Sequence, residues 1–263
     1  MQQLVLPMYT ALEQDHDFRS LGAAMGLAYR ELFHVPFRTG HYYALVPDAA
    51  DDERLPCLIF LHGMGGNMKP YLWVLSRLTT RVRCVIVAPT FGIGNWDKPG
   101  GAQFVVAVAR EAVATLSVDR ERIFLFGYSN GAMGVTRAVI QEPELFKGLF
   151  YLSPVTEDDL FHRSEFLKGR GHRHILFIHG GRDERIPREF VQGTVAALQQ
   201  LGCDVTLRVY ENEDHFLLFS QPEAVLSDIA DCMAVSSPAG AGQDQGTSHY
   251  RFRGFGTDSL SSN

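Results

Sequence analysis

The serine best suited to act as a nucleophile is Ser129, in the motif Gly127-Tyr-Ser-Asn-Gly131. A G-x-S-x-G motif between a strand and a helix places its serine on a sharp, strained turn. The apolar run Ile123–Phe126 precedes the motif, and Ala132-Met-Gly-Val follows it as a helix start. The pattern therefore predicts a hydroxyl that projects above the carboxyl end of a sheet. An ordinary strand–helix loop is the alternative interpretation.

Two further chemistry-bearing residues follow predicted strands. Asp183 ends the segment His179-Gly-Gly-Arg-Asp183 after the run Ile175–Ile178, and His215 follows the run Val205–Tyr210 by a few residues. Ligand and catalytic sites of open α/β sheets form at the carboxyl ends of the strands, so we expect Ser129, Asp183 and His215 at one edge. A histidine there can take the proton of a serine, and a carboxylate can orient that histidine.

The elements that would position these residues are short apolar runs alternating with amphipathic segments. Most runs are apolar at every position, which is typical of strands buried on both faces of a parallel sheet. The chain therefore predicts an α/β fold with a mostly parallel central sheet and helices on both faces. An antiparallel edge strand is expected at Tyr42–Pro47. The predicted parallel strands are Cys57–Leu61, Cys84–Ala88, Ile123–Phe126, Gly148–Leu152, Ile175–Ile178 and Val205–Tyr210, and the helices are Gln103–Leu116, Arg188–Leu201 and Pro222–Met233.

At this point the chain resembles the α/β-hydrolase superfamily of serine hydrolases, which carries serine, acid and histidine in this order. The spacings of 54 and 32 residues between Ser129, Asp183 and His215 are typical of it. The phrase Gly127-Tyr-Ser-Asn-Gly-Ala-Met-Gly134, with His62-Gly-Met-Gly-Gly66 and His179-Gly-Gly-Arg-Asp-Glu-Arg-Ile-Pro187, is similar to the carboxylesterase, dienelactone-hydrolase and polyhydroxybutyrate-depolymerase-like branches. Prolyl-oligopeptidase-type domains share these features. The resemblance covers roughly residues 38–234.

The resemblance implies a role for each residue. Ser129 would be the nucleophile, His215 the base that later protonates the leaving group, and Asp183 the group that orients His215. The oxyanion would accept hydrogen bonds from the backbone N–H groups of Asn130 and Met64. Gly65 is the rival to Met64 in this second position.

Other acids were weighed against Asp183. Glu213 and Asp214 directly precede His215, but neighbouring side chains in a loop seldom face each other. Asp204 opens a predicted strand, which puts it at the opposite edge of the sheet. Asp183 is therefore the favoured partner of His215.

Several histidines have other interpretations. His62 and His179 each precede a glycine at a strand end, so both could approach the site, but the resemblance makes them structural supports of loop backbone. His172 and His174 form an H-x-H pair that could bind a metal ion. Because no third ligand is evident, we expect neither a metal nor a cofactor.

The substrate side is less determined. The loop Pro89–Asp97 follows a predicted strand, so Phe91 and Trp96 either line a pocket or one of them anchors a folded surface loop. The insertion between Ser153 and His174 is too short for the large lid of many lipases, which favours small or medium acyl esters. We expect the substrate to contact His62, Phe91, Trp96, Tyr128 and Phe216.

Composition excludes several classes of protein. The 263 residues are 46 % hydrophobic and 21 % charged, which excludes a disordered chain, a collagen-like fibre and a coiled coil. The net charge of −6 argues against a nucleic-acid partner, and no apolar run reaches the roughly 20 residues of a membrane helix. Four scattered cysteines and a poor signal peptide favour a reducing, cytoplasmic location. The sequence leaves open whether the chain forms a homodimer.

These observations predict one α/β-hydrolase domain over residues 1–235, with 1–36 as an extension packed on it, a helix over Phe18–Phe33 and a disordered tail over 236–263. The expected activity is hydrolysis of a small-molecule carboxylic ester through an acyl-enzyme. A peptidase or thioesterase is the alternative, although peptidases of the superfamily usually carry a propeller for which 263 residues leave no room. A non-catalytic binding protein on the same fold ranks lower, because serine, base and oxyanion loop are all present.

Overall fold

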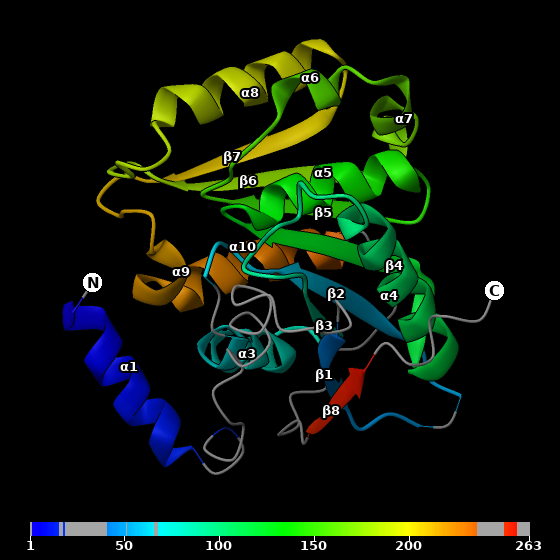
Figure 1. Cartoon of the computed structure of the whole chain (residues 1–263), viewed down its shortest axis with the longest axis vertical. Helices are drawn as coiled ribbons and strands as arrows, with labels where there is room; N and C mark the ends of the chain where they lie inside the picture. Colours follow the sequence, from blue (N-terminus) through cyan, green and yellow to red (C-terminus); the bar gives the residue numbers. More distant parts are fainter. Residues whose placement is uncertain are drawn as a thin grey trace.

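A central sheet of eight strands organises the part of the chain that this computed structural model describes, which is residues 2–15, 18, 41–50, 52–65, 68–235 and 250–256. The strand order across the sheet is β7-β6-β5-β4-β2-β3-β1-β8 (Figure 1). The strands are β1 (His41–Pro47), β2 (Leu55–Leu61), β3 (Val85–Thr90), β4 (Val118–Tyr128), β5 (Gly148–Leu152), β6 (His174–Gly180), β7 (Asp204–Tyr210) and β8 (Tyr250–Gly256).

Six of these strands, β2 to β7, run parallel to their neighbours. They contain the six apolar runs, so the prediction of a mostly parallel sheet is confirmed. β1 pairs antiparallel with β3, as predicted, with His41 opposite Thr90. Because β2 to β7 all point the same way, the loops that follow them meet at one edge of the sheet.

The outer edge of β1 differs from the prediction. β8 pairs antiparallel with β1 from His41↔Gly256 to Pro47↔Tyr250, so β1 is not the edge strand and the tail is not disordered over Tyr250–Gly256. An unpaired strand edge presents a row of free N–H and C=O groups, and β8 satisfies those of β1. The rest of the predicted tail, 236–249 and 257–263, lies outside the described residues.

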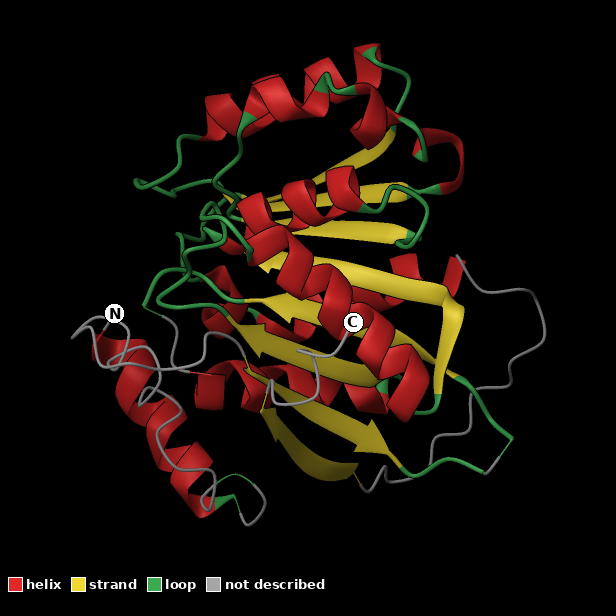
Figure 2. Cartoon of the chain, turned by 45° about the vertical axis from the view of Figure 1, so that its right-hand side comes forward, coloured by secondary structure: helices red, strands yellow, loops and turns green. Residues whose placement is uncertain are grey.

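Helices cover both faces of the sheet (Figure 2). One face packs against α4, α5, α6, α7 and α8, and the other against α1, α3, α9 and α10. The predicted helices at α4, α8 and α10 are confirmed, with Pro222 in the first turn of α10. No helix in the described ranges is long and apolar enough to cross a membrane. The bounds are α1 (Gln2–Gln14), α3 (Met68–Ser76), η1 (Arg77–Thr80), α4 (Gly101–Thr115), α5 (Gly131–Gln141), α6 (Asp158–Phe161), α7 (Ser164–Leu167), η2 (Arg170–His172), α8 (Arg188–Gln200), α9 (Leu217–Ser220) and α10 (Pro222–Val235).

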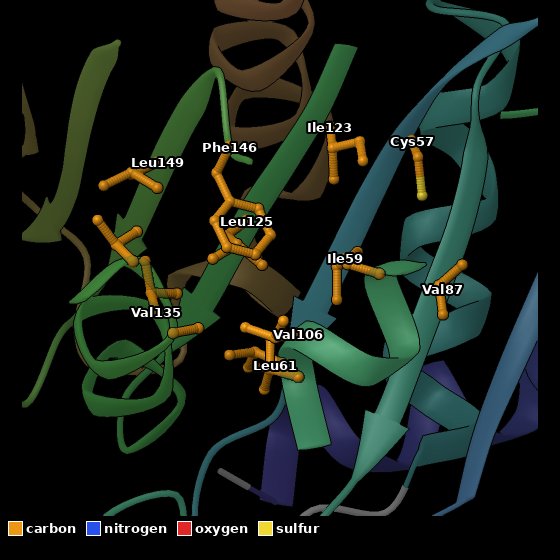
Figure 3. Packing of buried hydrophobic residues seen from close by; sticks show 14 of the residues in the cluster. Cys57, Ile59, Leu61, Val87, Val106, Ile123, Leu125, Val135, Phe146 and Leu149 are labelled. Atoms are coloured by element: carbon orange, nitrogen blue, oxygen red, sulfur yellow. The ribbon is translucent and has the colours of Figure 1, made fainter. Parts of the chain in front are cut away.

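The fully apolar strands supply two separate cores, because successive side chains of a strand point to opposite faces. In β2, Cys57, Ile59 and Leu61 enter the core under α4 and α5, whereas Leu58 and Phe60 enter the core under α3 and α10. Figure 3 shows part of the first core. Burial on both faces makes this sheet a stiff platform for the loops at its carboxyl edge.

The N-terminal segment packs on α3. Leu12 and Phe18 are fully buried in the second core, and the Lys69 ammonium pairs with the Glu13 carboxylate at 2.9 Å. The helix predicted over Phe18–Phe33 lies, apart from Phe18, outside the described residues.

Candidate active site

Ser129 lies on the turn that joins β4 to α5, with a backbone φ of +52°. Its N–H donates to the Leu152 carbonyl at 3.0 Å, which ties the turn to the end of β5. A Cβ atom at Gly131 would lie 2.0 Å from the Leu61 carbonyl oxygen, and one at Gly127 would lie 2.6 Å from the start of α5. The two glycines of the motif are therefore required by this close approach of strand and helix.

His215 and Asp183 meet Ser129 at this edge. The His215 Nε2 atom lies 3.1 Å from the Ser129 Oγ atom, and His215 Nδ1 lies 2.8 Å from Asp183 Oδ2. The loop after β7 thus brings a ring between a hydroxyl and a carboxylate that belong to loops after β4 and β6. In this geometry His215 can accept the serine proton while Asp183 stabilises the imidazolium that results.

The Asp183 carboxylate is held as an anion. Burial acts to raise its pKa, but hydrogen bonds from the His215 ring and from the N–H groups of Ile186 and Arg185 outweigh it, so the pKa is lowered. The second oxygen of Asp183 accepts from both N–H groups, at 3.0 and 2.9 Å. Both carboxylate oxygens are therefore fixed, and one of them is aimed at His215.

The other acids near His215 are engaged elsewhere. Glu213 binds the Ser220 hydroxyl and the Gln221 amide, and Asp214 Oδ1 accepts from the Phe216 N–H at 2.8 Å. Asp204 lies at the opposite edge, where it binds His174 Nδ1 at 2.9 Å. None of the three makes a side-chain hydrogen bond to the His215 ring in the described part of the chain.

The backbone N–H groups of Met64 and Asn130 make no hydrogen bond within the described part of the chain. The N–H of Gly65, the rival of Met64, donates to the Ile93 carbonyl at 2.9 Å. Asn130 precedes the first turn of α5, where unpaired N–H groups and the helix dipole favour a negative charge. Gly63 keeps the two loops close, because its Cβ position lies 3.2 Å from the Ser129 Cβ atom.

Comparison with known proteins agrees with this architecture. The Phospholipase/Carboxylesterase family profile matches residues 103–233. The crystal structure of a thermostable esterase superposes with a TM-score of 0.60 at 20 % identity, covering 73 % of this chain and 58 % of that one. A thermophilic esterase from the Planctomycetes species Thermogutta terrifontis gives a TM-score of 0.59 at 18 % identity, covering 79 % and 92 %. The chain has the α/β-hydrolase fold.

A curated relative of this α/β-hydrolase is the dipeptidyl peptidase family member 2 of Caenorhabditis elegans, which is 26 % identical over 220 residues. The match covers 68 % of this chain but only 26 % of the relative, so this chain spans about a quarter of the relative's length. The chain is thus similar to esterases and to a peptidase, and its likeness to the solved esterases bears on the fold.

The aromatic residues expected on the substrate side of the hydrolase have different environments. Trp96 is fully buried, and its Nε1 atom donates to the His62 carbonyl at 2.8 Å. Trp96 is therefore the anchor of the Pro89–Asp97 loop, which was the alternative to a pocket-lining role. Phe91 is partly exposed and stacks on Trp96 with ring centroids 6.1 Å apart.

Tyr128 and Phe216 flank the histidine. The Tyr128 hydroxyl donates to the His215 carbonyl at 2.9 Å from a buried position, so it holds the loop of the base. Phe216 is partly exposed, and its ring meets that of His215 edge to face at 5.7 Å. Of the five residues expected to contact substrate, Phe91 and Phe216 are the ones that reach the surface.

His62 and His179 are buried supports of the loops. His62 Nδ1 bonds to the Gly63 carbonyl at 2.7 Å, and burial lowers the His62 pKa to about 4, against the opposing effect of that bond. His179 Nε2 bonds to the Ile186 carbonyl at 3.1 Å. Burial also lowers the pKa of His179, so both rings are neutral at pH 7.

A metal site is not formed in the described ranges, where no three His, Cys, Asp or Glu residues come together to hold an ion. His172 is exposed in η2 and His174 is paired with Asp204, both at the amino end of the sheet.

Two neighbours of the site, Arg185 and Ser153, were not predicted from the sequence. Ser153 directly follows a strand, as Ser129 does, and this position in the sequence could have indicated that Ser153 lies near the site.

Proposed function

We propose that this chain is a serine hydrolase that cleaves carboxylic esters through an acyl-enzyme, with Ser129, His215 and Asp183 as its catalytic residues. The observation that carries the proposal is the continuous chain of contacts from Ser129 Oγ to His215 Nε2 and from His215 Nδ1 to Asp183. A serine hydroxyl is a weak nucleophile until a base removes its proton, and this geometry supplies the base.

In the first half of the reaction, Ser129 Oγ attacks the ester carbonyl while His215 takes its proton. The carbonyl oxygen becomes an oxyanion that accepts hydrogen bonds from the N–H groups of Met64 and Asn130. One such donor is worth about 2.7–4 kcal/mol of transition-state stabilisation. His215 then protonates the leaving alcohol as the carbon–oxygen bond breaks, which leaves the acyl group on Ser129.

In the second half, a water molecule attacks the acyl-enzyme and His215 accepts its proton. Collapse of the second tetrahedral intermediate returns the proton to Ser129 and releases the acid. Asp183 remains ionised throughout, since its hydrogen bonds keep its pKa low. The chemistry needs no group beyond these residues and water.

The substrate class is also a proposal. Between β5 and β6 the chain forms only α6, α7 and η2, each of three or four residues. Such a short insertion favours small or medium acyl groups over long-chain lipid. The four free cysteines, three of them buried, fit a reducing compartment, so we infer that the enzyme acts in the cytoplasm.

A peptidase is the second candidate, because the curated relative is a dipeptidyl peptidase family member. The same serine, histidine and oxyanion donors can attack an amide, whose leaving amine also needs the proton of His215. A thioester would be attacked in the same way.

The test is a fluorophosphonate probe together with a panel of substrates. We expect the probe to label Ser129, identified by mass spectrometry of the peptide, and to leave the Ser129→Ala variant unlabelled. Graded p-nitrophenyl esters and peptide p-nitroanilides then compare ester with amide cleavage. Folded protein that is not labelled and cleaves neither class would contradict the proposal.

A further inference from the structure

Arg185 lies beside the candidate site and is used by none of the steps above. It belongs to the loop after β6, where its N–H donates to Asp183, and its side chain is exposed. The guanidinium carbon lies 4.8 Å from the centre of the Phe216 ring. Phe216 contacts His215, which contacts Ser129, so the guanidinium is separated from the serine hydroxyl by two aromatic rings.

In the part of the chain that the structure describes, the charge of Arg185 has no acidic partner, in contrast to that of Arg188. Arg182 donates to the Asn212 side chain, and Arg188 pairs with Glu211 at 2.7 Å. Within the described residues, no carboxylate lies within 4.0 Å of the guanidinium nitrogen atoms of Arg185. Asp214, the acid next to His215, directs its Oδ1 atom to the Phe216 backbone instead.

The field of this charge reaches into the site. Burial raises the pKa of the Tyr128 hydroxyl, and the positive charge of Arg185 opposes that rise. The carboxylates of Asp183 and Asp214 act on the pKa of Tyr128 in the opposite direction to Arg185, so both signs of charge lie near this hydroxyl. An unpaired cation at this distance attracts an anion that enters the site.

The ring of Phe216 also prepares the guanidinium for recognition. A guanidinium is attracted to the face of an aromatic ring, which restricts its orientation. Its planar N–H fork can then grip the two oxygens of a carboxylate, a geometry that lysine cannot reproduce. A neutral ester has no group that would use this fork.

We propose that Arg185, supported by Phe216, is an anion-binding subsite that selects esters carrying a carboxylate on the alcohol portion. The alcohol portion is chosen because His215 protonates the leaving alcohol, and the Phe216 ring that carries Arg185 contacts His215. The inference rests on the proposed esterase function and deepens it by naming a substrate class.

The experiment compares matched esters on the full-length protein. The alcohol pair is 4-acetoxybenzoate and 4-acetoxybenzamide, which differ in a carboxylate and a neutral amide. The acyl pair is mono-4-nitrophenyl adipate and 4-nitrophenyl hexanoate. We expect the wild type to prefer 4-acetoxybenzoate in kcat/KM, mainly through a lower KM, and 0.5 M NaCl to reduce the preference by screening.

In Arg185→Gln, the ratio of kcat/KM for 4-acetoxybenzoate over 4-acetoxybenzamide should fall about tenfold, which is what a loss of about 1.4 kcal/mol means. Arg185→Lys should show a ratio between those of Arg185→Gln and the wild type, since lysine keeps the positive charge but lacks the paired N–H groups of the guanidinium. Arg188→Gln is the matched control, because its charge is already paired with Glu211. It should leave the ratio unchanged.

Several results would overturn the inference while leaving the esterase function intact. These are a wild type that cleaves both esters without preference, a variant at position 185 that loses both equally, or a preference confined to the acyl pair. If the folded wild type cleaves no ester of either pair, the proposed function fails, and this subsite fails with it.

Discussion

Ser129 and Ser153 follow neighbouring strands in nearly the same backbone conformation. Tyr128 and Leu152 are paired across β4 and β5, and the serines come next, with φ angles of +52° and +42°. Each serine N–H donates to a carbonyl near the end of the next strand along, that of Leu152 for Ser129 and that of Ile178 for Ser153. The environments of the two hydroxyls are nonetheless opposite.

The Ser129 hydroxyl is partly exposed and faces His215, whereas the Ser153 hydroxyl is fully buried and has no hydrogen-bond partner in the described part of the protein. Ser129 lies two residues before Gly131, where α5 begins, whereas Ser153 is followed by Pro154. Strained backbone at a strand end is therefore common to both residues. What distinguishes a candidate nucleophile is the base beside it and the helix that begins after it.

The largest expected effect separates the two hydroxyls directly. Ser129→Ala should lower kcat for ester hydrolysis on the order of a millionfold, as removing the nucleophile does in comparable enzymes. Ser153→Ala should stay within about threefold of the wild type, since its hydroxyl touches no reacting group. Initial rates on one p-nitrophenyl ester measure both variants, and circular dichroism checks their folding. Equal losses in both variants would erase the distinction.

The next effect extends the comparison to the acids. Two His–Asp pairs of the described residues are hydrogen-bonded, His215–Asp183 at the carboxyl edge of the sheet and His174–Asp204 at the amino edge, at 2.8 and 2.9 Å. Asp183→Asn should reduce kcat about 10⁴-fold, because it favours the wrong tautomer of His215. Asp204→Asn is the matched control and should retain full activity. An active Asp183→Asn variant would remove Asp183 from the mechanism.

A third prediction concerns Gly131, a glycine in the turn after Ser129 that has no counterpart in the turn after Ser153. Gly131 stands two residues after Ser129, and Val155 stands two residues after Ser153. Gly131→Ala should lower the free energy of unfolding by about 3 kcal/mol, since its Cβ would overlap the Leu61 carbonyl. Gly193→Ala, where nothing lies within 4 Å in the middle of α8, should raise it by about 0.5–1 kcal/mol. Urea denaturation compares the two, and a neutral Gly131→Ala would refute the packing argument.

The last prediction concerns the pH dependence of stability. His62 directly follows β2, which neighbours β4 on the side away from β5. Its Nε2 atom, like the Ser153 hydroxyl, is buried and has no hydrogen-bond partner in the described ranges. Its pKa is about 4 when folded and 6.5 when exposed, so the unfolded state binds more protons between these values. Wild-type stability should fall by up to about 3 kcal/mol as pH drops from 6.5 to 4.

His62→Asn keeps a donor for the Gly63 carbonyl but has no proton to take up in this range. Its free energy of unfolding should therefore depend less steeply on pH, as measured by urea denaturation at pH 4, 5, 6 and 7. Parallel curves for the two proteins would mean that His62 does not titrate as inferred.

The sheet and the three residues at its edge were predictable because their signals are local. A strand buried on both faces must be apolar at every position, and a serine between a strand and a helix has few other interpretations. Helix α3 was not predicted, because Met68–Ser76 is buried on nearly all sides and shows no amphipathic pattern.

Other features depend on contacts between distant segments. From the sequence, Trp96 could equally line a pocket or anchor its own loop. Only its hydrogen bond to the His62 carbonyl decides between these two roles. The position of Arg185 over Phe216 joins two loops 31 residues apart, a relation that no periodicity in the sequence encodes. β8 was missed because Tyr250–Gly256 lies in a stretch of small and polar residues.

The pairing of β8 with β1 has a consequence for synthesis of the chain. Roughly 200 residues separate the two strands, so the outer side of β1 stays uncovered on the ribosome until nearly the whole sheet has emerged. During that interval nascent chains on neighbouring ribosomes expose the same unsatisfied row of backbone groups, which is a template for mispairing. β8 covers this row of β1 when it emerges, and the outer side of β8 then becomes the edge of the sheet.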